Sequence, residues 1–302
     1  MDRLFQFICN KIPHFKLNNK FKKKIFYLIF CIFKLIIKGP FILNFKNFKF
    51  YSYPQKNNFS RFLLSRVEMP DKAEIDFIKK NIDDNSIFLD CGANQGFYSI
   101  PIAANNNLVD VHAFEPSDKE YELIKNNIKI NNLKNITLRK NAISDKTGKM
   151  YFFDNNSSVN DTSGGVLINS EKSTNKTKQV ESITLDTYID KINVQLNKKI
   201  FIKIDIEGYD IDAIYGAKNI INKYFCVIIF EFSKLILENK SFSSNNFESF
   251  LFDNNLIIKN FNNEELSVKN LLELISNLDK KHITIGNYVL LKKDLDAKLK
   301  FC

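Results

Sequence analysis

Short apolar runs alternate with segments of helical periodicity along most of the chain. The apolar runs predict strands at 48–53, 87–90, 109–115, 136–140, 199–205, 225–232 and 283–292. Apolar spacing of three to four residues predicts helices at 71–81, 96–104, 117–131, 248–255 and 264–278. The polar stretch 149–180 is expected to form a strand hairpin and a loop over a pocket. This alternation predicts an α/β fold, with a mostly parallel, doubly wound sheet and helices on both faces.

The first buried strand leads into a glycine-containing turn. The apolar run ends at Asp90, and Gly92 and Gly96 follow. This layout is typical of a nucleotide-cofactor loop, because glycine allows a sharp turn and a close backbone approach to the ligand. Asp90 replaces the first glycine of a dinucleotide loop, which disfavours a pyrophosphate cradle and a nicotinamide oxidoreductase. An uncharged or cationic cofactor such as S-adenosylmethionine fits better. The alternative is an ordinary strand–turn–helix.

The second strand ends in an acid. Glu115 lies 23 residues after Gly92, and Pro116 then ends the strand. This spacing is close to the ~20 residues at which an acid after the second strand binds the ribose hydroxyls. A carboxylate can accept a hydrogen bond from each of two vicinal hydroxyls, so Glu115 is the candidate ribose ligand.

Five ordered blocks resemble FkbM-type S-adenosylmethionine-dependent methyltransferases. They are 90–99, 113–116, 141–148, 182–186 and 202–208, with Gly216 and Ala217 after the last. The family commonly has Glu two residues after the last glycine of the fifth block, where this chain has Asp210. The resemblance covers about 80–235. It implies a Rossmann-like class I methyltransferase fold, S-adenosylmethionine as cofactor, and acceptor hydroxyls on sugars, glycans, lipids or polyketide-like products.

The first three strands of the predicted sheet supply the candidate cofactor ligands. Asp90 could hold a polar or cationic part of the cofactor, and Asn141 could meet the adenine amino group. Residues of the first turn could line the methionine or adenine side, although its aromatic residues could equally belong to the core. The predicted cofactor-binding residues are Asp90, Gly92, Ala93, Asn94, Gly96, Tyr98, Ser99, Glu115 and Asn141.

Acids at the ends of the fourth and fifth strands are the candidate catalytic groups. A hydroxyl nucleophile must lose its proton, and Asp205, with Glu207 second, is the predicted base or acceptor-positioning group. Asp205 could instead cap the turn. Glu231 is the candidate substrate-binding residue, or a solvated acid. No histidine accompanies these acids, and the cysteines lack metal-site spacing, so no metal site is predicted.

The positive charge lies at the N-terminus. Residues 1–66 hold 14 of the 44 Lys and Arg residues and one of the 34 acids, a net charge of +13. The other residues hold 30 bases and 33 acids, a net charge of −3. The sequence therefore divides into a basic apolar helical arm, 1–45, and a methyltransferase domain, 46–302.

The arm contains a lysine-flanked apolar stretch. The 13 residues of 25–37 are fewer than the ~20 needed to span a bilayer, and no secretory cleavage site follows. Residues 20–40 could lie in the interface of an anionic membrane or pack on the domain as a helix. A cytoplasmic protein is expected, either free or peripheral on the inner face of the membrane. The arm lacks polar residues interleaved for base reading, so no nucleic-acid partner is expected.

Together these features predict an enzyme that O-methylates a hydroxyl of a sugar, glycan or lipid-linked acceptor. The alternative is a non-catalytic module that keeps the cofactor fold within a glycan-assembly complex. The predicted cofactor and catalytic acids disfavour that alternative.

Overall fold

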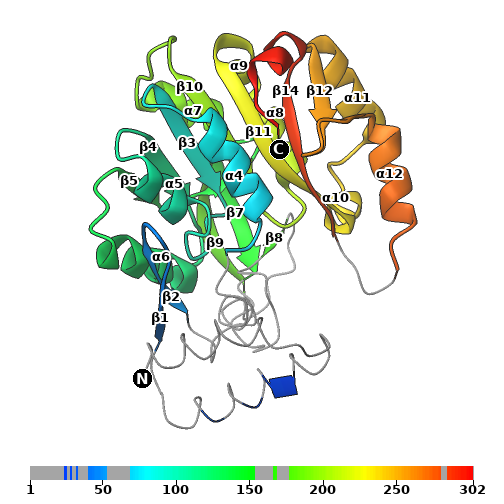
Figure 1. The fold of residues 1–302 in the computed structure, drawn as a ribbon. Coiled ribbons are helices and arrows are strands. Elements are labelled where there is room, and N and C mark those ends of the chain that lie inside the picture. Colours follow the sequence, from blue (N-terminus) through cyan, green and yellow to red (C-terminus); the bar gives the residue numbers. More distant parts are fainter. Residues whose placement is uncertain are drawn as a thin grey trace.

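A computed structural model describes residues 40–52, 69–153, 166–168, 177–279 and 284–301, and the isolated positions 24, 25, 28 and 32. Its central sheet has the strand order β13-β12-β14-β11-β10-β3-β4-β5 (Figure 1). The strands are β3 Ser86–Cys91, β4 Asp110–Phe114, β5 Ile136–Arg139, β10 Lys199–Ile204, β11 Phe225–Ser233, β12 Leu256–Lys259, β13 Glu265–Leu266 and β14 Thr284–Lys292.

The sheet has the doubly wound order that the sequence predicts. Strands β5, β4, β3, β10 and β11 are parallel neighbours, so the chain starts in the middle and winds outward in both directions. Strand β14 is antiparallel to β11 and to β12, and lies between them. This is the Rossmann order with one antiparallel strand inserted before the sixth strand.

Helices cover both faces of the sheet, each over its own apolar core (Figure 1). One face carries α4 Lys72–Asn81, α5 Ser99–Asn105 and α6 Asp118–Ile130. The other carries α7 Leu185–Lys191, α8 Asp210–Tyr215, α9 Lys218–Lys223, α10 Lys234–Glu238, α11 Ser244–Asp253 and α12 Val268–Ser276. Side chains alternate between the faces: Ile202 packs under α7 and α8, and Phe201 lies on the α4 side.

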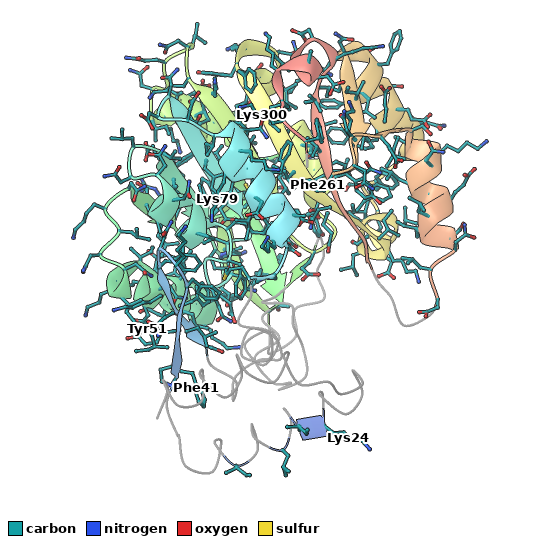
Figure 2. The ribbon with its side chains drawn as sticks, in the orientation of Figure 1. Lys24, Phe41, Tyr51, Lys79, Phe261 and Lys300 are labelled. Carbon is teal, nitrogen blue, oxygen red and sulfur yellow. The ribbon has the colours of Figure 1, made fainter. Side chains whose placement is uncertain are left out.

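The C-terminal segment fixes α4 against the domain. It contains the 3₁₀ helix η2, Lys293–Lys298. The backbone N–H of Lys300 donates to Asn81 Oδ1 at 2.7 Å, and the Phe77 ring packs on Phe301 and Phe261 (Figure 2 labels Phe261 and Lys300). This packing matters for the site, because the residues just before α4 and in its first turn reach the cavity.

A hairpin of β1 Phe41–Asn44 and β2 Lys49–Ser52 docks on α6. The backbone N–H groups of Lys49 and Tyr51 donate to the amide oxygens of Asn131 and Asn127, at 2.6 and 2.7 Å. These two side chains lie one helical turn apart, and they accept the backbone hydrogen bonds that a neighbouring strand would otherwise accept. Figure 2 labels Phe41 and Tyr51 on this hairpin. The strand predicted at 48–53 is confirmed over β2. The sequence Lys38-Gly-Pro40 predicts that any helix of the arm ends there, and the structure has strand β1 from residue 41; the arm before residue 40 lies largely outside the described residues.

A smaller sheet packs beside the cavity, with the order β6-β9-β7-β8. Its strands are β6 Ala142–Ile143, β7 Gly148–Phe153, β8 Val166–Ile168 and β9 Thr177–Ile183. Strand β7 is antiparallel to both β8 and β9, which confirms the predicted hairpin and adds a third strand. The loop expected over the pocket falls largely on 154–165 and 169–176, outside the described residues.

Three sequence predictions need correction. The first cofactor helix begins at Ser99 and not at residue 96, because the chain keeps turning until the Ser99 N–H reaches the Asp90 carboxylate. Strand β12 was not predicted, because its three apolar residues are too few to show a period between two helices. The following helix begins at Val268, after the short strand β13 and a capping box between Ser267 and Asn270.

Candidate active site

A cavity of about 450 Å³ opens at the carboxyl ends of β3, β4, β10 and β11. This is the edge where ligands bind in doubly wound sheets, and the volume lies within the range of small-molecule sites. The lining residues come from the ends of these strands, the start of α4, the small sheet and β14. The polar ones are Asp71, Glu74, Asp90, Asn94, Tyr98, Glu115, Asn141, Lys203, Asp205, Glu207, Glu231 and Asn287.

Asp90 faces the cavity but is also tied to α5. Its Oδ2 accepts hydrogen bonds from the backbone N–H and the hydroxyl of Ser99. Burial raises the pKa of Asp90 to about 6, against the opposing effect of these hydrogen bonds. Ser99 is buried and lies behind the cavity wall. Of these two predicted cofactor residues, Asp90 can therefore touch a ligand, and Ser99 orients Asp90.

The two turn glycines serve the packing of the protein. Gly92 has a φ of +81°, and a Cβ there would lie 2.0 Å from the carbonyl oxygen of Asp205. The Asp205 N–H also donates to the Cys91 carbonyl at 3.0 Å. Gly92 thus lets the turn after β3 lie against the turn after β10. Gly96 lies outside the lining, and a Cβ there would meet Ile100 and Ile124.

Glu115 forms the wall at the end of β4. Its Oε2 accepts from the Asn94 N–H and its Oε1 from the Ser117 N–H, both at 2.8 Å. Only 5% of Glu115 is exposed, and this burial raises the pKa of its carboxyl group to about 8. Each carboxyl oxygen keeps further acceptor capacity for a hydroxyl donor. The same contacts hold Asn94 beside Glu115, so two predicted cofactor residues form one unit.

The remaining predicted cofactor residues also reach the cavity. Ala93, Asn141 and Tyr98 lie in its lining. The Tyr98 hydroxyl donates to Asp71 Oδ2 at 3.0 Å, which joins the cofactor loop to the residue before α4. The cavity wall therefore unites Asp90, Gly92, Ala93, Asn94, Tyr98, Glu115 and Asn141.

The predicted catalytic acids line the same cavity as the cofactor loop. Asp205, Glu207 and Glu231 all contribute to its wall. The Asp205 side chain is 38% exposed, so a ligand can reach its carboxylate. Burial, and then the charges of Asp205 and Asp210, raise the pKa of Glu231 to about 8. The part-exposed Asp205 can therefore accept a proton, and the mostly protonated Glu231 can donate a hydrogen bond.

Sequence reasoning missed four polar residues of the cavity: Asp71, Glu74, Lys203 and Asn287. Asp71 and Glu74 come from the start of α4, which carries no motif. Lys203 stands inside the fifth sequence block, two positions before Asp205, so strand alternation could have placed it on the α4 side. Asn287 comes from the antiparallel strand β14, whose place in the sheet has no local signal.

Other reactive groups of the described chain lie outside the cavity. His112 is a buried core residue that faces α7, where its Nδ1 lies 2.7 Å from the Tyr188 hydroxyl. Cys91 and Cys226 are buried, and burial raises both thiol pKa values. Asp210 is also buried outside the lining, and accepts from the Gly208 N–H at 3.2 Å. No His, Cys, Asp or Glu cluster suited to a metal ion occurs within the described ranges.

Buried acids in and next to the cavity predict a pH-dependent stability. Burial raises the folded-state pKa of Asp210 to about 7, and of Glu115 and Glu231 to about 8. Between about pH 4 and 8 the folded protein therefore holds protons that the unfolded chain has released. Its free energy of unfolding should fall by up to about 1.4 kcal/mol per pH unit for each such group.

Urea unfolding at pH 5.5 and pH 8.5 would measure this loss of stability. Glu231→Gln should make the decline shallower, because the amide carries no proton to release. Equal or greater stability at pH 8.5 would contradict the prediction.

The donor set of the cavity suits a nucleoside with a cationic group. Glu115 offers carboxyl oxygens where ribose hydroxyls are expected, and Asn141 offers an amide on the same wall. The acids Asp90 and Asp205 offer negative charge nearby, which favours a sulfonium or ammonium group. These residues fit S-adenosylmethionine.

Comparisons with known proteins identify the family of the chain. The model of the methyltransferase FkbM domain matches residues 90–261. A structure of methyltransferase FkbM from Methylobacillus flagellatus KT is 15% identical with a TM-score of 0.37, over 57% of this chain and 42% of that one. This chain therefore spans less than half of that structure's length. No curated protein sequence matches the chain.

Two further solved structures carry bound cofactor or its product. TYW2 from M. jannaschii, in complex with AdoMet, is 11% identical with a TM-score of 0.41, over 84% of this chain and 85% of that one. The O-methyltransferase from Bacillus cereus, in complex with SAH, is 12% identical with a TM-score of 0.36, over 74% and 80%. At these identities nothing about acceptors follows from either likeness. Because the family model matches more than half of the 302 residues, the chain belongs to the FkbM methyltransferase family, and S-adenosylmethionine is its methyl donor.

Proposed function

We propose that this methyltransferase transfers the methyl group to a hydroxyl oxygen of a sugar, glycan or lipid-linked acceptor. The observation that carries the proposal is the position of Asp205. Its part-exposed carboxylate lines the same cavity as the cofactor loop, and its backbone lies against Gly92 of that loop. A hydroxyl bound between them would have its proton acceptor and the cofactor within one site.

Each side of the cavity has its own task in this reaction. When bound, S-adenosylmethionine would supply the methyl group from its sulfonium sulfur. The carbon–sulfur bond would break, and the sulfur would leave as a neutral thioether. The acceptor oxygen forms the new bond to that carbon, and Asp205 takes the hydroxyl proton. Glu115 would hold the ribose hydroxyls of the bound cofactor, and Asn141 would bind its adenine amino group.

The acceptor side of the cavity favours a molecule with several hydroxyl groups. Glu207, Glu231, Asp71 and Glu74 present carboxyl groups around Asp205. Carboxylates accept hydrogen bonds strongly, and hydroxyls donate them. A sugar ring offers several such donors at once, which supports a glycan or a sugar carried on a lipid.

Calorimetric titration with S-adenosylmethionine tests the cofactor side. Wild-type protein should bind saturably, and Glu115→Ala should weaken binding by about 10- to 100-fold, because hydrogen bonds from two ribose hydroxyls are lost, each contributing about 0.5–1.5 kcal/mol. NAD, titrated in parallel, should not bind. Unchanged affinity in Glu115→Ala would refute the ribose role.

Transfer of labelled methyl to a glycan panel tests the acceptor class, and labelling of amines or thiols alone would refute O-methylation.

We further propose that the arm contacts the inner face of a membrane through residues 20–40. Most of this segment lies outside the described residues. Its support is the charge of 1–66 together with exposed apolar side chains at Leu28 and Ile32. No helix in the described part of the chain has the length and apolar character needed to cross a bilayer.

Vesicle co-sedimentation tests this contact. The full chain should bind vesicles with anionic lipids at low salt and release them as salt rises, since each base near the surface adds about 1 kcal/mol. The triple variant Lys22→Gln, Lys23→Gln, Lys24→Gln should bind more weakly. Equal binding to purely zwitterionic vesicles, or none at low salt, would argue against the electrostatic contact.

A further inference from the structure

Lys203 is a buried lysine at the floor of the active-site cavity. It lies one residue before the end of β10, in register with Asp90 on β3 and Ile229 on β11. Only 1% of its side chain is exposed. A lysine in a central parallel strand replaces an apolar core residue, and its burial is costly unless the ammonium is paired. The buried ammonium of Lys203 therefore requires polar or charged partners.

The Lys203 ammonium makes two hydrogen bonds and one ion pair. Nζ donates to the Ile204 carbonyl at 3.0 Å and to Asn287 Oδ1 at 2.9 Å. The third partner is Asp205, whose Oδ2 lies 3.5 Å from Nζ. The ammonium also sits 5.3 Å from the centre of the Tyr98 ring, within cation–π range. Lys203 thus touches the predicted base and the cofactor loop at once.

The contacts continue into α4. Asn287, which receives the Lys203 hydrogen bond, donates through Nδ2 to Glu74 Oε1 at 3.2 Å. Tyr98, under the same ammonium, donates to Asp71. One cation therefore connects the acids of β10 and α4 across the acceptor side of the cavity.

The charge balance shows that the cation persists at neutral pH. Burial alone would lower the pKa of Lys203, but the charges of Asp205, Glu231, Asp71 and Asp210 outweigh it and raise that pKa above the ordinary value. The influence is mutual, because Lys203 lowers the pKa of Glu231 and of Glu74 against the effect of burial. Without Lys203, both acids should hold their protons to higher pH.

We propose that Lys203 is a positioning residue for methyl transfer, whose ammonium fixes the Asp205 carboxylate and, through Asn287, the Glu74 carboxylate at the acceptor side of the cavity. The proposal rests on the proposed role of Asp205 in O-methylation. It assigns Lys203 no contact with the reacting atoms. It adds a residue of β10 to the machinery and makes the start of α4 part of the acceptor site.

The kinetic test compares Lys203→Met, Lys203→Arg and the double variant Lys203→Met/Asp205→Asn. Lys203→Met should lower kcat about 100-fold, the loss expected for a catalytic group displaced by about 1 Å, with little change in S-adenosylmethionine affinity. It should add little to Asp205→Asn, because both changes disable the same carboxylate. Lys203→Arg should recover part of the activity. Lys199→Met is the matched control, since it removes the other lysine of β10, which pairs with Asp83 outside the cavity.

A second measurement needs no acceptor and no activity. Carboxyl ¹³C NMR titration should show Glu231 and Glu74 releasing their protons at higher pH in Lys203→Met than in wild type, with Lys199→Met unchanged. Unshifted titration in a folded Lys203→Met protein, or losses that multiply fully with Asp205→Asn, would overturn the inference. A wild-type protein that methylates no hydroxyl would instead refute the proposed function and leave the NMR result standing. If Lys203→Met does not fold, Asn287→Leu carries the test: it removes the amide that donates to Glu74, so Glu74 should release its proton at higher pH than in wild type, and Lys203→Arg, which keeps the charge, should leave Glu231 unshifted.

Discussion

Asp205→Asn is expected to lower kcat for methyl transfer by about 10²- to 10⁴-fold, the usual contribution of a positioned general base. The amide has the size of the carboxylate but cannot take the hydroxyl proton. The backbone contact between Asp205 N–H and the Cys91 carbonyl does not involve the side chain, so the turn should keep its shape. S-adenosylmethionine affinity should therefore change little. Steady-state kinetics together with calorimetry would measure both quantities.

The neighbouring acids give the controls for this variant. Glu207→Gln and Glu231→Gln remove carboxyl groups from the same cavity without touching the proposed base. They should raise KM for the acceptor more than they lower kcat, because they bind acceptor hydroxyls. If Asp205→Asn kept full kcat, or if it lost cofactor binding and thermal stability instead, Asp205 would be a turn cap and not the base.

The sequence predicted this site because its main parts follow from topology. Asp90, Glu115, Asp205 and Glu231 each stand at the end of an apolar run, and parallel strands bring their carboxyl ends to one edge. The local sequence pattern was therefore sufficient to predict that these four acids lie close together. The same logic predicted the doubly wound sheet and five helices to within a few residues, but it missed the short helices α7, α8, α9 and α10.

The missed residues depend on packing between distant segments. Asp71 and Glu74 reach the cavity because Phe77 and its neighbours bury α4 on the sheet, and no periodicity shows which end of α4 will overhang the site. Asn287 arrives on a strand inserted out of chain order. Lys203 was visible in the sequence, yet a lysine in an apolar strand shows its function only once its partners are known.

Gly92→Ala is expected to disable both halves of the site at once. Sequence reasoning assigned this glycine to ligand approach, but a Cβ there would lie 2.0 Å from the Asp205 carbonyl oxygen and 3.0 Å from its carbonyl carbon. These are backbone atoms, so a side-chain rotation cannot relieve the contact. The backbone at a φ of +81° adds about 1–2 kcal/mol of strain for an L-residue. The turns after β3 and β10 must therefore move apart.

A separation of about 1 Å between the cofactor loop and the base should lower kcat/KM about 100-fold. S-adenosylmethionine affinity should fall as well, which distinguishes Gly92→Ala from Asp205→Asn. Gly148→Ala is the matched control, because it shares a positive φ, +156°, while a Cβ there meets nothing within 4 Å. It should lose some stability and keep its activity. Equal effects of the two substitutions would mean that backbone strain, and not the contact with Asp205, explains Gly92. A larger effect of Gly92→Ala on both cofactor binding and turnover would show that the two turns form one structural unit.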